Sequence, residues 1–216
     1  MATRAIERGA TDPDPTPATW STHRRIHDKL AHVSATSGSG RPPGRLRVPP
    51  LVKPLHIVLV EPEIPPNTGN IARLAAATCC PLHLVGRLGF RIDEHSVRRA
   101  GLDYWHMVEL AQHPTLSEAE AQIAAAADAA SPPRSWLFSG KARRSYLDVD
   151  YRHGDALVFG KESSGLDEAL LAERSHSVLG IPTLGGVRSL NLANAVAIVV
   201  YEALRQLGAL DAPVHE

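Results

Sequence analysis

Short apolar runs alternate with amphipathic stretches over most of this chain. The runs are rich in Leu, Val and Ile, which is typical of strands buried in a parallel sheet. They predict strands over residues 55–60, 82–85, 105–110, 135–139, 156–160 and 177–181. Apolar residues at helical spacing predict helices over residues 68–78, 93–100, 116–129 and 166–172, and a last helix that begins after Ser189 or Asn191 and ends before Gly208. Strands that alternate with helices predict an α/β fold, in which helices cover both faces of a parallel sheet.

The last helix has the clearest pattern. Apolar residues recur at helical spacing from Val196 to Leu207, so one face of the helix is expected to be buried. A side-chain oxygen of Ser189 or Asn191 is expected to cap its first turn, and Gly208 is expected to end it.

Composition divides the chain. Residues 1–53 are rich in Pro, Gly and Ser and have little to bury, which predicts a disordered tail before a folded domain over 54–210 and a short tail over 211–216. The first 53 residues hold nine Lys/Arg and four Asp/Glu, whereas the rest hold fourteen and nineteen. A basic tail on an acidic body indicates an anionic partner, although an inert, solvated tail has the same composition.

The remaining composition points to the cytoplasm. Cys79 and Cys80 are the only cysteines; adjacent cysteines rarely pair, so both are expected to be reduced thiols. No cluster of Cys and His predicts a metal site. No apolar run is long enough to span a membrane, and the N-terminus lacks the apolar core of a signal peptide.

Three polar loops follow predicted strands, over residues 61–70, 160–165 and 181–191. Ligands of parallel α/β sheets bind beyond the carboxyl ends of the strands, so the loops are expected to form one site. A GxGxxG fingerprint is absent, residues 160–165 lack the Lys-Ser/Thr pair of a phosphate loop, and no G-x-S-x-G occurs. These absences argue against a dehydrogenase, a nucleoside triphosphatase and a serine hydrolase.

The loops carry three motifs that resemble those of the SPOUT RNA methyltransferases. The motifs are Asn67-Thr-Gly-Asn70-Ile-Ala-Arg73, Phe159-Gly-Lys-Glu162-Ser-Ser-Gly165-Leu166 and Arg188-Ser189-Leu190-Asn191-Leu-Ala-Asn194. The phrases Glu61-Pro-Glu-Ile-Pro-Pro and Arg98-Arg-Ala-Gly-Leu-Asp-Tyr104 narrow the resemblance to the small tRNA wobble-nucleotide 2'-O-methyltransferases. The match runs from residue 55 to residue 208, in order and correctly spaced, and the tail lies outside it.

The resemblance implies a C-terminal trefoil knot, a homodimer and S-adenosylmethionine as the methyl donor, with S-adenosylhomocysteine as product. The substrate would be the ribose 2'-hydroxyl of the wobble cytidine or uridine of tRNA, with leucine tRNAs expected. By position in the motifs, the cofactor would be lined by Phe138, Gly160, Ile181, Ser189 and Leu190. Residues 183–187 and 138–140 depart from the family pattern. The departure at 183–187 leaves the contacts to the methionine portion of S-adenosylmethionine undefined by the resemblance.

The resemblance also suggests catalytic residues. Arg73 would polarise the hydroxyl or bind the neighbouring phosphate, and Ser189 and Asn191 would orient the ribose. Arg73 as general base is a hypothesis, because arginine is a poor base in water.

Candidate substrate contacts are Asn70, Glu162, Arg143, Arg144 and Tyr201. Each has a structural alternative: Asn70 and Glu162 as helix caps, Tyr201 as a core or dimer residue, and the arginines as solvated charges. Three other functions stay open: methylation of ribosomal RNA, a non-catalytic RNA-binding dimer, and an unrelated nucleotide-binding α/β protein.

Overall fold

The computed structural model describes residues 46–90, 107–127, 131–211 and 214–215. All of them belong to one compact unit, Pro43–Glu216. The predicted helix over 93–100 and most of the predicted N-terminal tail lie outside the described residues.

The main sheet is parallel, as the sequence predicts. Its order is β4-β3-β2-β6-β5-β7. The strands are β2 (His56–Val60), β3 (Leu82–Val85), β4 (Leu110–His113), β5 (Ser135–Phe138), β6 (Ala156–Phe159) and β7 (Val178–Leu179). β2 and β6 are neighbours at the centre of the sheet, with Ile57 paired to Leu157.

The predicted position of the strand that corresponds to β4 is wrong. The sequence predicts a strand over 105–110, but β4 runs from Leu110 to His113. β4 is an edge strand and only His113 is fully buried in it, so its sequence, LAQH, has no continuous apolar run. The prediction relied on apolar residues that precede β4. One of them, Val108, is buried in the core but does not belong to a strand.

Four α-helices are described: α1 (Pro65–Thr78), α3 (Leu116–Ala125), α4 (Glu168–Glu173) and α5 (Leu192–Gln206). α1 begins three residues earlier than predicted, because Pro65 and Pro66 occupy its first positions, where the missing N–H groups are not needed. Asn191 caps α5 by accepting from Ala193 N and Asn194 N, as predicted, and Gly208 follows its end with a left-handed φ of 66°.

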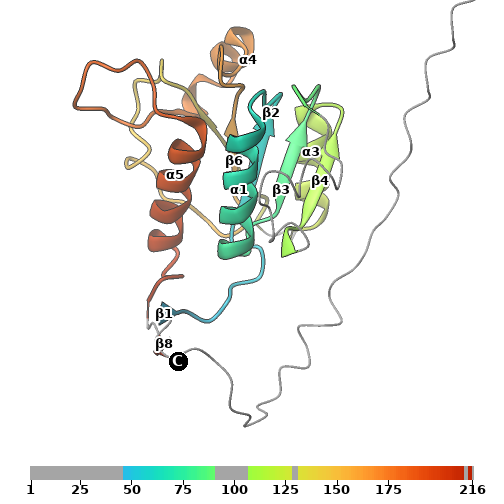
Figure 1. The fold of residues 1–216 in the computed structure, drawn as a ribbon, viewed down its shortest axis with the longest axis vertical. Helices are drawn as coiled ribbons and strands as arrows, with labels where there is room; N and C mark the ends of the chain where they lie inside the picture. The colour runs from blue at the N-terminus through green and yellow to red at the C-terminus, as the bar shows by residue number, and fades with distance from the viewer. Residues whose placement is uncertain (1–45, 91–106, 128–130, 212–213, 216) are drawn as a thin grey trace, which may run out of the picture. The chain divides into compact units, whose positions relative to one another are not determined.

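Residues along each strand alternate between the two faces of the sheet. Ile57, Leu59, Leu157 and Phe159 pack against α1 and α5, which lie side by side in Figure 1. The intervening residues pack against apolar residues of α3 and α4. Every central strand is therefore covered on both faces, which explains its continuous apolar sequence.

A short second sheet joins the two ends of the folded unit. β1 (Leu46–Arg47) pairs antiparallel with β8 (Val214–His215). Both segments belong to regions in which the sequence predicts tails.

A buried carboxylate stands at the start of β6. Asp155, 1% exposed, accepts from the side chain of Arg134, at 2.7 and 3.2 Å, and from the indole of Trp136 at 3.0 Å. The backbone N–H groups of Arg134 and Arg152 donate to the same carboxylate at 3.1 and 3.0 Å. The carboxylate is thus fully satisfied by charge and by hydrogen bonds, as a buried ion requires.

Three histidines form a row across neighbouring strands. His56 Nδ1 lies 3.0 Å from His83 Nε2, and His83 Nδ1 lies 2.9 Å from His113 Nε2. Each ring in such a row can donate through one nitrogen and accept through the other only while it is neutral. Burial lowers the pKa of His56 to about 4 and that of His83 to about 3, and also lowers the pKa of His113.

This row predicts a loss of stability in mild acid. Below pH 6.5 the unfolded imidazoles take up protons while the folded ones stay neutral, so the free energy of unfolding falls as the pH falls toward 4. Each histidine contributes at most about 1.4 kcal/mol per pH unit. Urea unfolding between pH 7 and 4.5 should show a shallower pH dependence for His83→Asn than for the wild type. His153→Asn, at an exposed position, should keep the wild-type slope; equal slopes for all three proteins would contradict the prediction.

Candidate active site

The structure joins the three predicted loops at the carboxyl ends of the strands. Glu162, in the loop after β6, accepts hydrogen bonds from Glu63 N at 2.8 Å, Ile64 N at 3.3 Å and Asn67 Nδ2 at 2.9 Å. Asn67 Oδ1 accepts in turn from Asn191 Nδ2 at 3.0 Å. One chain of side chains, the Glu162–Asn67–Asn191 network, therefore connects the loop before α1, the loop after β6 and the start of α5.

The network also explains how α1 begins. Its own capping residue, Ile64, offers no side-chain acceptor, so the Glu162 carboxylate accepts from the backbone there instead. A negative charge at this end also suits the helix dipole. The sequence suggested a capping role for Glu162, but at the following helix; there, Asp167 caps α4.

Two further pairs bind the same two loops together. Lys161 Nζ lies 2.8 Å from Glu61 Oε2, and hydrogen bonding to Glu61 raises the pKa of Lys161. Ser163 donates to Glu63 through its hydroxyl and its backbone N–H, both at 2.9 Å, which lowers the pKa of Glu63. Sequence reasoning missed these pairs and the buried position of Asn67, because they join residues about a hundred positions apart.

Three of the expected cofactor residues follow adjacent strands in the order β6-β5-β7. Gly160, Phe138 and Ile181 lie at or just beyond the carboxyl ends of these strands. Ile181 is half-buried, but the Phe138 ring is buried and stacks on Phe159, with ring centroids 4.6 Å apart. Phe138 can therefore meet a ligand mainly through its backbone.

Gly160 is required by the loop itself. A Cβ atom there would lie 2.2 Å from the carbonyl carbon of Gly165, so no larger residue fits without moving the loop. Across the site, a Cβ on Gly140 would lie 3.4 Å from Arg188 O, which places the end of β5 beside the third motif. Ser189 is exposed and Leu190 half-buried in that motif.

The remaining expected residues lie apart from the loops. Asn70 and Arg73 are exposed one turn apart on α1, and Tyr201 is 48% exposed on α5. Tyr201 follows Asn191 by ten residues, or about 15 Å along the helix axis. α1 and α5 begin beside each other at the Asn67–Asn191 contact, and Arg73 follows Asn67 by six residues, or about 9 Å along the axis of α1.

Arg143 and Arg144 do not act as a pair in the structure. Both residues are exposed, but the Arg144 guanidinium lies over Trp136, 5.8 Å from the centroid of its ring. Trp136 belongs to the first half of β5, away from the carboxyl ends of the strands.

The Glu162–Asn67–Asn191 network predicts a local loss of stability. Glu162→Ala leaves the backbone N–H groups of Glu63 and Ile64, just before α1, and the Asn67 amide without their acceptor, so we expect the free energy of unfolding to fall by about 1–3 kcal/mol. Urea unfolding measures this change. The matched control is Glu173→Ala, which removes an exposed carboxylate from α4 and should change stability by less than about 0.5 kcal/mol. Equal midpoints for the two variants would contradict the structural role of Glu162.

The family model described as the SpoU rRNA Methylase family matches residues 54–201, and the chain belongs to this family. It is 46% identical over 154 residues to the tRNA (cytidine(34)-2'-O)-methyltransferase of Saccharophagus degradans, covering 71% of this chain and 96% of that protein. It is 43% identical over 155 residues to the enzyme of the same name from Escherichia coli (strain K12), covering 71% and 94%.

Solved structures of methyltransferases are also similar to this chain. One, concerned with the 2-OH methylation of C/U34 on tRNA, has 45% identity and a TM-score of 0.63, covering 71% of this chain and 95% of that one. The SpoU methyltransferase AviRb from Streptomyces viridochromogenes, in complex with AdoMet, has 27% identity and a TM-score of 0.62, covering 74% and 63%. These findings confirm the resemblance inferred from the three motifs.

Among the described residues, no group of three or more His, Cys, Asp or Glu is arranged to hold a metal ion. Within the same residues, no helix combines the length and the apolar character needed to cross a membrane.

Proposed function

We propose that this protein transfers a methyl group from S-adenosylmethionine to the ribose 2'-hydroxyl of nucleotide 34 of tRNA, in the cytoplasm. The observation that carries the proposal is the joining of the three motif loops in a chain that matches tRNA (cytidine(34)-2'-O)-methyltransferases over nearly their whole length. The family is named for rRNA methylases, but the relatives at 43–46% identity are named tRNA (cytidine(34)-2'-O)-methyltransferases.

The residues at the strand ends fit the cofactor. Half-buried Ile181 and Leu190 offer an apolar surface for an adenine ring, and the adjoining loop backbones offer hydrogen-bonding groups. When bound, S-adenosylmethionine supplies an electrophilic methyl group. The contacts between residues 144–146 and Gly180 bring two separate loops together there, which supports the trefoil knot that the resemblance implies.

The chain's own residues then position and activate the ribose. Methyl transfer requires the 2'-hydroxyl in line with the methyl group, so positioning supplies much of the rate. Exposed Ser189 is placed to hydrogen-bond the ribose. Arg73 polarises the hydroxyl or holds the adjacent phosphate. The Asn191 amide nitrogen donates to Asn67, and its oxygen accepts from the α5 backbone. We therefore propose that Asn191 holds the third motif in position and does not contact the reacting atoms.

A homodimer suits the exposed residues of α5. Ile198 and Tyr201, 38% and 48% exposed, lie one turn apart on a helix whose other face is buried. We propose that a second copy covers this surface and brings Tyr201 and Arg73 toward the partner's cofactor loops.

The test is methyl transfer from labelled S-adenosylmethionine to unmodified leucine tRNA, followed by nuclease digestion and mass analysis of the nucleosides. The proposal expects label in 2'-O-methylcytidine or 2'-O-methyluridine from position 34. A matched tRNA carrying a 2'-deoxynucleotide at position 34 lacks the acceptor hydroxyl and should stay unlabelled. Label at another position, or in ribosomal RNA alone, would overturn the proposed substrate.

A further inference from the structure

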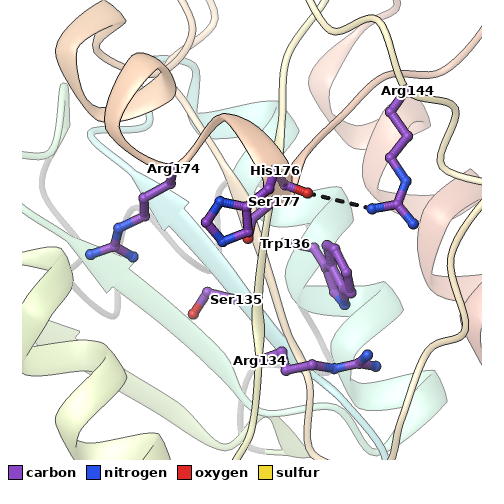
Figure 2. A pocket seen from close by; sticks show the side chains of 7 residues that line it. All are labelled: Arg134, Ser135, Trp136, Arg144, Arg174, His176 and Ser177. Carbon is purple, nitrogen blue, oxygen red and sulfur yellow. Dashed lines mark hydrogen bonds between the residues drawn. The ribbon is translucent and has the colours of Figure 1, made fainter.

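A basic pocket of about 490 Å³ lies at the starts of β5 and β7, the ends of these strands opposite to the candidate active site, and the side chain of Arg144 reaches it from the loop after β5. β7 pairs only with Leu137 and Phe138, so the first half of β5 has β6 on one side and no paired strand on the side of β7. Figure 2 shows Arg134 and Arg144 on either side of Trp136 at this uncovered edge, and Arg174 beyond His176.

Two of the three arginines already have counter-ions. Arg134 is paired with Asp155 at 2.7 Å, and Arg174 with Glu120 at 2.6 Å. These ion pairs hold both guanidinium groups in place at the wall of the pocket.

Arg144 differs from both. It donates to two backbone carbonyls, Asp148 O at 2.8 Å and His176 O at 3.4 Å, and forms no ion pair within the described part of the chain. Its guanidinium and that of Arg134 lie 5.8 and 5.0 Å from the Trp136 ring centroid, contacts that orient a cation without neutralising it. The pocket therefore has one guanidinium charge in excess of its carboxylates.

The chemistry of the pocket fits a phosphodiester. Such a group carries a single negative charge, which matches the one excess guanidinium, and its two free oxygens accept hydrogen bonds. The hydroxyls of Ser135 and Ser177 and the imidazole of His176 line the same pocket and can supply further donors.

The net charge of the folded domain limits where that domain can bind RNA. Residues 54–216 hold fourteen Lys/Arg against nineteen Asp/Glu, so the folded domain as a whole does not attract RNA. Within the folded domain, affinity for RNA must come from places where positive charge is concentrated, and phosphate contacts fix the orientation of a nucleic acid without reading its sequence.

We propose that this pocket binds a phosphodiester of the tRNA backbone, away from the nucleotide that is methylated. The inference rests on the proposed function and adds to it a second RNA contact at the opposite end of the sheet. Arg144 is the residue that makes the contact, while Arg134 and Arg174 shape the pocket.

The test compares Arg144→Gln with Arg152→Gln, which removes the same charge from an exposed position outside the pocket. Fluorescence anisotropy with labelled tRNA at several salt concentrations measures affinity. We expect Arg144→Gln to weaken binding about tenfold and to make the plot of log affinity against log salt less steep by about one. Arg152→Gln should match the wild type. In methyl transfer, Arg144→Gln should raise KM for tRNA and leave kcat unchanged.

A second pair of variants guards against misfolding of Arg144→Gln. His176→Glu places a negative charge at an exposed position of the pocket and should weaken tRNA binding, whereas His153→Glu, exposed outside it, should have a smaller effect. Unfolding midpoints identify any variant that is not folded.

Equal affinities and salt slopes for the variants inside and outside the pocket would overturn the proposal, while methyl transfer by the wild type would stand. A pocket for free phosphate would give Arg144→Gln unchanged tRNA affinity but weaker binding of inorganic phosphate by calorimetry, and this also overturns it. If the wild type binds tRNA without methylating nucleotide 34, the proposed function fails, but a loss of affinity in Arg144→Gln still supports the pocket.

Discussion

Arg73→Ala is expected to lower kcat for methyl transfer to tRNA by about a hundredfold or more, while the affinity for S-adenosylmethionine stays close to that of the wild type. The reason is geometric and electrostatic. Arg73 is exposed on α1, away from the strand ends that would line the cofactor, so its loss should not disturb cofactor binding. The weakly nucleophilic 2'-hydroxyl loses a group that polarises it or holds its phosphate, and such groups contribute about 10²–10⁴ in rate.

Single-turnover kinetics with saturating cofactor and tRNA measures the chemical step, and calorimetry measures cofactor affinity. Arg73→Lys separates two roles, because lysine keeps the charge but loses the planar guanidinium. Full turnover by Arg73→Lys would remove the guanidinium itself from the mechanism, and full turnover by Arg73→Ala would remove the residue. Arg152→Lys, an exposed arginine at the other end of the sheet, is the control and should behave as the wild type.

The largest expected loss of stability comes from Asp155→Ala. The substitution leaves the Arg134 guanidinium without its counter-ion and three N–H groups, including the indole of Trp136, without their acceptor. Removing one partner of a buried ion pair typically destabilises a protein by about 3–5 kcal/mol. Since the Arg134 side chain remains 30% exposed, we expect a value near 3 kcal/mol, the lower end of that range.

Urea unfolding at pH 7 measures this loss against Glu109→Ala. Glu109 also accepts a hydrogen bond from a basic side chain, Lys53, at 2.6 Å, but the Glu109 side chain is 59% exposed. Its loss should therefore lower the free energy of unfolding by less than about 1 kcal/mol. Similar midpoints for the two variants would show that the Asp155 network adds little to stability.

The sequence predicts the central strands and α5 well because their signals are local. The runs at β2, β3 and β6 are continuous and apolar since both faces are buried, and Asn191 lies where a cap is expected. The edge strand β4 was misplaced because a half-exposed strand has no such run. The position of the three polar loops after predicted parallel strands also predicted correctly that these loops meet.

What the sequence did not predict depends on pairs that are distant along the chain. Nothing near Glu162 indicates that it accepts hydrogen bonds from residues 63, 64 and 67. Likewise, Arg143 and Arg144 are adjacent in sequence, yet the structure sends Arg144 toward Trp136 and the opposite end of the sheet. Side-chain direction in an irregular loop follows from tertiary packing and leaves no periodic signal.

The order of the strands has a consequence for how activity is acquired. Within the sheet, β4, β3 and β2 come from residues 56–113 and β6, β5 and β7 from residues 135–179, and the two groups of strands pair only where β2 meets β6, a hundred residues apart. Contacts of such long sequence separation form late and slowly. Because Glu162 and Asn191 reach Asn67 across this boundary, a nascent or partly refolded chain has ordered strands before it has a catalytic site. Enzymatic activity should therefore return after secondary structure when the protein refolds.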